Sequence, residues 1–332
     1  MLGARRASLR ELLAENRTYD PEYSYGLANH LSMTLSALAA LGADDGVLTS
    51  FAEHYRTRLR PLRQGAPLSA GDWRASLGSP SALVGLIQHF ERELSVRDRA
   101  AVLRDVLAAA TPGLAAGAFH GLIRTAYALH AEEDAELAHA LGYFVMVAQP
   151  LRPLPAPRAT SAASPHDLLE LAASDPRLTK GISGQLITDA LRVAVEQPGF
   201  DDFVAALRVG PDTLDELAQA ALDLYVHTLD FGALHAVTST HALRLLLPHS
   251  PDPELALRYQ FQALLAVSLT IPASSHIVPS TAPLPDWSGI AAAALQSDDD
   301  HDSKLVYTCR EESALRLPDD YRRAASLRMR LL

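Results

Sequence analysis

Cysteine and lysine are the residues that this chain contains least of. Its 332 residues include one cysteine, Cys309, and only two lysines, Lys180 and Lys304, among 29 basic residues. A single cysteine excludes an internal disulfide and any zinc site built on paired cysteines. The shortage of lysine fits a general bias toward arginine. Each lysine that is kept is therefore of interest, because lysine can lose its proton and arginine cannot.

Several other features are missing, and each excludes a class of protein. No apolar run approaches the roughly 18 residues of a membrane-spanning helix, so no membrane partner is expected. Residues 1–16 carry scattered charges without an apolar core, which predicts no secretory signal and a cytoplasmic location. An excess of 39 acidic over 29 basic residues argues against a nucleic-acid partner. There is no GxGxxG and no glycine-rich phosphate loop, so no nucleotide site is predicted.

Helical periodicity dominates what is present. Apolar residues recur at helical spacing, as Phe51, Tyr55 and Leu59 do, while sustained period-two alternation is scarce. This pattern predicts an all-α fold, with one large helical domain over residues 1–332 that draws its site residues from distant helices. Two proline-rich stretches, residues 149–165 and 270–287, are predicted to be surface loops of this one body.

Histidines in apolar surroundings are the main candidates for chemistry. His30 begins an apolar helix, His120 lies in a helix predicted over residues 117–130, and His235 and His241 lie in FGALHAVTSTHALRLLLP. Burying one unpaired imidazole costs a few kcal/mol. Hydrogen bonds within the core would satisfy a lone histidine, whereas one metal ion would satisfy several at once.

Helix geometry leaves that choice open. His235 and His241 are six residues apart, which is about 240° around a straight helix. The two rings would reach one ion only across an irregular or π-type turn, which residues 238–240 would tolerate. No HExxH motif is present, and no facial-triad spacing defines a site.

The acidic stretch SDDDHDSKLVYTCREE holds the second lysine. One interpretation is a solvated loop that enters a helix, with Lys304 paired to Asp300 or Asp302. The other is a lysine directed into a functional site. A free amine with a pKa near 10.4 is a poor metal ligand. In a desolvated site beside a dication the amine would lose its proton and take up CO₂, and the carbamate would offer an anionic oxygen.

Four segments, taken in order, resemble the questin oxidase-like family. They are DPEYSYGLANHLSMTLSALAALGA with FAEHYRTRLRPL, then FHGLIRTAYAL, then LHAVTSTHALRLLLP, and finally DDDHDSKLVY. The ordered set NH…FH…LHxVTxxHA…DxHxxK carries the resemblance, which runs from Asp20 to Tyr307. The resemblance implies an oxidoreductase, a helical oxygenase that acts with O₂ on a polycyclic aromatic substrate of anthraquinone or polyketide type. The reaction would be Baeyer–Villiger-type oxygen insertion or oxidative ring cleavage.

The resemblance also implies a mononuclear non-haem Fe(II) held by histidines and a carboxylated lysine. Matched motif by motif, the ligands would be His30, His120, His235, His241 and Lys304. His301 lies within the last motif and is expected beside a ligand rather than as one. Arg124, one helical turn after His120, is a candidate catalytic partner for an anionic substrate.

Two other functions compete with this interpretation. The first is a flavin- or NADPH-assisted Baeyer–Villiger oxidase, in which NADPH would bind without a dinucleotide fingerprint or act through a partner. The second is a non-catalytic helical binding protein, whose buried histidines would be hydrogen-bonded to protein groups and hold no metal. Metal content distinguishes the oxygenase from the binding protein, and NADPH dependence of turnover distinguishes the two enzymes.

Overall fold

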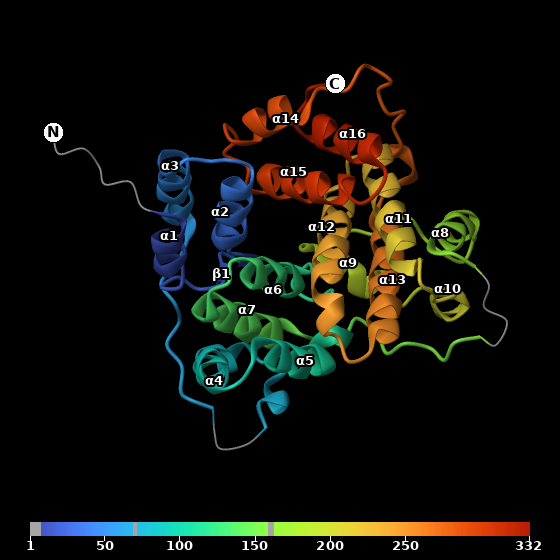
Figure 1. Cartoon of the computed structure of the whole chain (residues 1–332). Coiled ribbons are helices and arrows are strands. Elements are labelled where there is room, and N and C mark those ends of the chain that lie inside the picture. The colour runs from blue at the N-terminus through green and yellow to red at the C-terminus, as the bar shows by residue number, and fades with distance from the viewer. Residues whose placement is uncertain (1–7, 69–71, 159–162) are drawn as a thin grey trace.

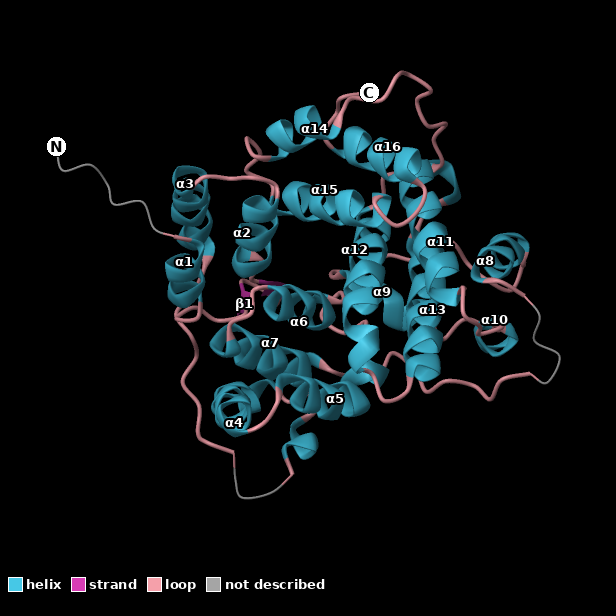
Figure 2. Cartoon of the chain, in the orientation of Figure 1, coloured by secondary structure: helices cyan, strands magenta, loops and turns pink. Residues whose placement is uncertain are grey.

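Helices form nearly all of the regular structure in the computed structural model, which describes residues 8–68, 72–158 and 163–332 (Figures 1 and 2). Within these ranges there are sixteen α-helices and one antiparallel hairpin of two short strands, β1 (Glu22–Tyr23) and β2 (Leu27–Ala28). The prediction of an all-α single domain is confirmed.

The helices are joined by short turns and a few longer loops. Their bounds are α1 (Leu9–Asn16), α2 (Leu31–Ala40), α3 (Asp45–Tyr55), α4 (Leu83–Val96), α5 (Arg99–Ala110), α6 (His120–His130), α7 (Asp134–Val147), α8 (Pro165–Ser174), α9 (Ile187–Ala194), α10 (Phe200–Ala206), α11 (Thr213–Thr228), α12 (Phe231–Leu246), α13 (Pro253–Thr270), α14 (Trp287–Ala294), α15 (Asp300–Ser313) and α16 (Pro318–Arg328).

Four of these helices come from distant parts of the chain and meet at the centre of the molecule. Helix α2 packs against α6 and α15, and α12 packs against the same two helices, so the four close a ring (Figure 1). Helix α12 is the most enclosed of them, since every residue from Gly232 to Leu243 is buried. Its run of alanine, leucine and small polar residues suits a position surrounded by other helices.

The remaining helices cover this ring. Helices α1 and α3 pack on α2, α4 and α5 pack on α7, and α14 and α16 cover α15. No helix among the described residues is long and apolar enough to cross a lipid bilayer.

The two proline-rich stretches connect helices. Residues 149–158 follow α7 and contain no buried residue, while residues 159–162 lie outside the described part of the chain. The second stretch runs from the end of α13 to the start of α14, and Ile271 is its one buried side chain.

Close packing between α6 and α7 requires Gly121. A Cβ atom at this position would lie 2.8 Å from Phe144 Cδ2 and 3.0 Å from Phe144 Cα, and Phe144 is fully buried. Overpacking of this kind costs about 1–3 kcal/mol, which exceeds the helix-propensity gain of about 1 kcal/mol from glycine to alanine. We therefore expect Gly121→Ala to lower the free energy of unfolding by about 1–2 kcal/mol in urea titrations.

Gly210→Ala is the matched control. No atom lies within 4 Å of a Cβ built at Gly210, so its free energy of unfolding should stay within about 0.5 kcal/mol of the wild type. Equal effects of the two substitutions would contradict the role given to Gly121.

Candidate metal centre

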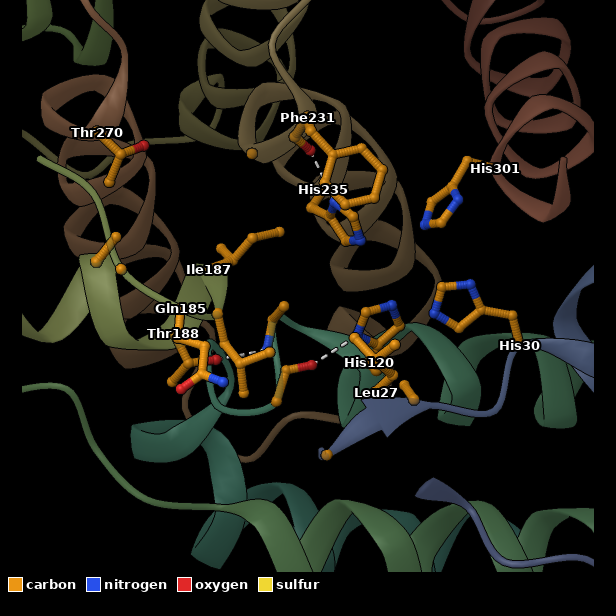
Figure 3. A pocket seen from close by; sticks show the side chains of 18 of the residues that line it. Leu27, His30, His120, Gln185, Ile187, Thr188, Phe231, His235, Thr270 and His301 are labelled. Atoms are coloured by element: carbon orange, nitrogen blue, oxygen red, sulfur yellow. Dashed lines mark hydrogen bonds between the residues drawn. The ribbon is translucent and has the colours of Figure 1, made fainter. Parts of the chain in front are cut away.

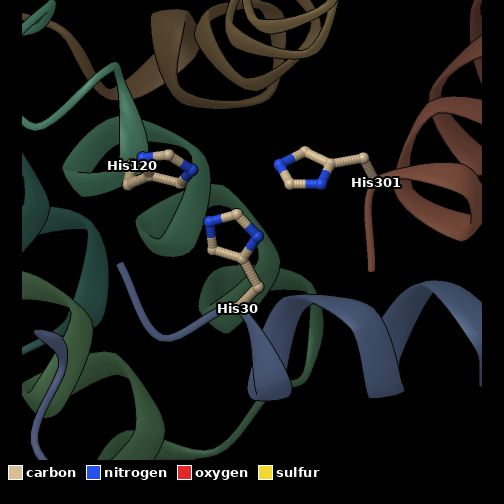
Figure 4. Close-up of side chains that lie close together, drawn as sticks. All are labelled: His30, His120 and His301. Atoms are coloured by element: carbon tan, nitrogen blue, oxygen red, sulfur yellow. The ribbon is translucent and has the colours of Figure 1, made fainter. Parts of the chain in front are cut away.

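Four imidazole rings meet where the N-terminal ends of α2, α6, α12 and α15 converge (Figure 3). The ring centroids of His30 and His120 are 4.4 Å apart, and those of His120 and His235 are 5.0 Å apart. His301 completes the circle at 5.3 Å from His235 and 4.7 Å from His30. We call these four residues the histidine cluster. Nitrogen atoms of His30, His120 and His301 lie within 4.8 Å of one another, and their rings point toward a common space (Figure 4).

Asn29 fixes the position of His30. The Asn29 amide donates to Asn16 Oδ1 at 3.0 Å, and its own oxygen accepts from the Leu31 N–H at 2.9 Å at the start of α2. The backbone N–H of His30 donates to Tyr55 Oη at 3.0 Å. With the backbone held from three sides, the His30 ring is directed into the centre of the helix ring.

A left-handed turn positions His120. Gly117, Ala118 and Phe119 have φ values of 57°, 52° and 66°, and only glycine adopts this region without steric cost. The turn delays the start of α6 to His120, three residues later than the sequence predicts. It also brings the Gly117 carbonyl to 2.6 Å from His120 Nδ1. Strained backbone of this kind persists at functional sites, where the surrounding structure holds it.

His235 is held in a similar way at the start of α12. Its Nδ1 lies 2.8 Å from the Phe231 carbonyl oxygen one turn earlier. In both His120 and His235 the Nδ1–H donates to a backbone carbonyl, which leaves the lone pair on Nε2. This is the tautomer that binds a metal through Nε2.

Asp300 organises the other two rings. Its Oδ1 lies 2.9 Å from His30 Nδ1 and 2.6 Å from His301 Nδ1. Burial raises the pKa of this carboxyl, but His30, His301 and Lys304 outweigh burial and lower the pKa below its usual value. Asp300 is thus an ionised carboxylate that orients two imidazoles. The sequence suggested Asp300 only as a partner of Lys304. Its position next to His301 and four residues before Lys304 could also have indicated a carboxylate that contacts the site.

Lys304 lies inside this arrangement and is not part of a solvated loop. Its side chain is 4% exposed, and Nζ is 2.8 Å from His30 Nδ1. Burial lowers the pKa of Lys304 to about 8. His301 and Lys304 are three residues apart on α15 and therefore share a face of the helix.

Burial also keeps three of the rings neutral. It lowers the pKa of His30 to about 3, with help from the nearby Lys304 cation. The pKa values of His120 and His235 lie well below the usual 6.5, and burial is again the largest cause. Neutral imidazoles are the form that binds metal ions.

The structure does not bring His241 or Arg124 to the histidine cluster. Helix α12 is regular, so His241 lies on a different face from His235, and its Nδ1 is 2.8 Å from Glu312 Oε1. Arg124 is buried and pairs with Glu136 at 3.2 Å. Neither residue lines the cavity beside the cluster.

A cavity of about 690 Å³ opens beside the cluster, within the size range of small-molecule sites (Figure 3). The hairpin, the segment 182–188 and the start of α12 form its walls. Apolar side chains such as Leu27, Ile187 and Phe231 form part of its lining, beside polar and charged residues. Phe231 is 47% exposed and meets the rings of His235 and His301 edge-on, at 4.7 and 4.6 Å between centroids.

The donor set fits a metal ion. His120 Nε2 and His301 Nε2 are buried and have no hydrogen-bond partner among the described residues. An unpaired buried ring nitrogen costs about 1–3 kcal/mol, and one ion shared by several rings would remove that cost. Imidazole nitrogens suit iron, zinc, copper and nickel.

Comparison with known sequences gives one family. The sequence model of the questin oxidase-like family matches residues 27–309, a span that includes all four rings of the cluster and Lys304. No curated protein matches the chain.

Proposed function

The chain belongs to the questin oxidase-like family, and from that premise we propose that it is an iron-dependent oxygenase. It would use O₂ to oxidise a polycyclic aromatic substrate of anthraquinone or polyketide type, by Baeyer–Villiger-type insertion or ring cleavage. The observation that supports this most is the closed circle of four imidazoles, three buried and one partly buried, beside a cavity of about 690 Å³.

We assign the iron to His30, His120, His235 and His301, together with a carboxylated Lys304. His301 takes the place that the motif comparison gave to His241, because its ring lies in the cluster and the His241 ring pairs with Glu312. Asp300 has the supporting role, since it contacts both His30 and His301.

The position of Lys304 favours its carboxylation. A buried amine with a pKa near 8 has a substantial neutral fraction at physiological pH, and a neutral amine attacks the carbon of CO₂. The protonated amine loses one proton to become neutral, and forming the N–C bond with CO₂ releases a second proton, so a cation becomes an anionic carbamate. Neutral imidazoles carry no charge to balance a dication, so this anion would supply the missing charge compensation.

Iron(II) would supply the one-electron step that lets O₂ react with closed-shell organic molecules. The side chains of this chain would orient the substrate and exclude water. Phe231 lines the cavity and is partly exposed there, so its ring is available for contact with a flat aromatic substrate. The apolar side chains of the wall, such as Leu27 and Ile187, would lower the dielectric around the reacting atoms and strengthen the electrostatic interactions there.

Metal content and oxygen uptake test this proposal. Protein purified without oxygen should contain about one iron per chain and should consume O₂ when a hydroxyanthraquinone is added. Uptake that requires NADPH would favour the assisted Baeyer–Villiger oxidase. Protein without stoichiometric metal and without O₂ uptake would leave the non-catalytic binding protein as the answer.

A further inference from the structure

Arg58 is the only lysine or arginine among the described residues that line the cavity. It ends the short 3₁₀ helix η1 (Arg56–Arg58) that follows α3, and its side chain is exposed. A single basic side chain in a wall that mixes apolar, polar and acidic residues is a point at which an anionic group of a ligand could be held, if the nearby carboxylates have partners of their own.

The guanidinium of Arg58 makes no ion pair with any described carboxylate, unlike its neighbours. Arg56 pairs with Glu15, Arg60 with Asp20, and Arg63 with Asp20 and Glu22. Three of the four carboxylates in the cavity wall also have partners of their own. Asp230 caps α12, Asp299 pairs with Arg328, and Asp300 holds His30 and His301. The fourth, Asp298, is exposed. The positive charge of Arg58 is therefore available to a ligand.

Tyr55 holds this cation near the histidine cluster. The Arg58 guanidinium lies 4.5 Å from the centroid of the Tyr55 ring, which is fully buried. The hydroxyl of the same tyrosine accepts the backbone N–H of His30. Stacking on an aromatic ring fixes a guanidinium and leaves its N–H donors free for a planar anion.

We propose that the cavity binds an aromatic anion, whose carboxylate or ionised phenol pairs with Arg58. This inference rests on the proposed function and adds the charge of its substrate. Arg58 takes the role that the sequence suggested for Arg124. The Arg124 guanidinium is already paired with Glu136 and does not line the cavity.

Binding of two matched pairs of probes tests the inference. Anthraquinone-2-carboxylate is compared with its neutral carboxamide, and 2-hydroxyanthraquinone with its methyl ether, by equilibrium dialysis against the isolated protein. Arg58→Ala should weaken binding of an anionic probe about tenfold or more, and should change binding of its neutral partner less than about twofold. Arg58→Lys should retain part of the preference. The pair that responds identifies the anionic group.

Arg56→Ala is the control, because Arg56 lies on the same turn but outside the cavity wall, and it should leave all four affinities unchanged. Equal weakening of both members of each pair by Arg58→Ala, or no weakening at all, would overturn the inference. Dialysis measures binding without turnover. If Arg58→Ala fails to discriminate between the probes while the wild type holds iron and consumes O₂, only the inference about Arg58 is wrong. If the wild type holds no iron and consumes no O₂, the proposed function is wrong instead.

Discussion

Replacing His30, His120, His235 or His301 singly by alanine is expected to remove most of the bound iron. Each substitution deletes one imidazole nitrogen donor from the circle of four rings. Changes to residues that only orient a ligand cost about 10–100-fold in metal affinity, and loss of a ligand should cost at least as much. Iron per chain, measured by elemental analysis after anaerobic purification, should fall to a small fraction of the wild-type value.

His241→Ala is the discriminating control for this series. His241 is also a buried histidine of α12, but its ring contacts Glu312 and lies outside the cluster. This variant should lose stability, because Glu312 loses a partner, yet it should keep its iron. Full iron in two or more of the four cluster variants, or loss of iron in His241→Ala alone, would show that the assignment of ligands is incorrect.

Lys304→Arg is expected to abolish iron binding although it preserves the charge of a free lysine. Arginine forms no carbamate ligand under these conditions and keeps its proton, so a fixed cation would lie where the proposed anionic ligand belongs. Lys304→Ala should bind little iron by itself and should regain part of it when acetate or bicarbonate is added. These small anions fit the space of the missing side chain and supply an oxygen donor.

Lys180→Arg provides the comparison within the same chain. Lys180 donates to the Ala172 carbonyl at 2.8 Å, a contact that arginine can also make, so iron content and turnover should equal those of the wild type. Wild-type iron in Lys304→Arg would remove Lys304 from the metal site and would support a purely structural role.

The sequence predicted the fold class well because helical periodicity is a local property. It failed at the start of α6, where residues 117–119 turn left-handed. A helix pattern continues through this turn in the sequence, and only contacts made in the folded protein hold Ala118 and Phe119 there, such as the Ala118 N–H bond to Thr188. No signal in the sequence reports such a tertiary constraint.

The sequence also predicted most of the histidine cluster. Helix geometry explains why it could not decide between His235 and His241. The six-residue spacing of His235 and His241 already placed them on different faces of a regular helix, and α12 is regular. The three-residue spacing of His301 and Lys304 placed those two on one face. Which of His235 and His241 faces His30, His120 and His301 depends on how α12 packs against α6 and α15, and this is a long-range property.

The ring of α2, α6, α12 and α15 has a consequence for how the protein matures. Its contacts close a loop between His30 and Lys304, almost the whole length of the chain, and closing so long a loop costs conformational entropy. The large buried core supplies hydrophobic free energy that offsets this cost without a metal ion. A zinc finger gains its fold from its ion, whereas the iron proposed above would bind to a chain that is already folded, with the cavity beside the histidine cluster as its route of entry.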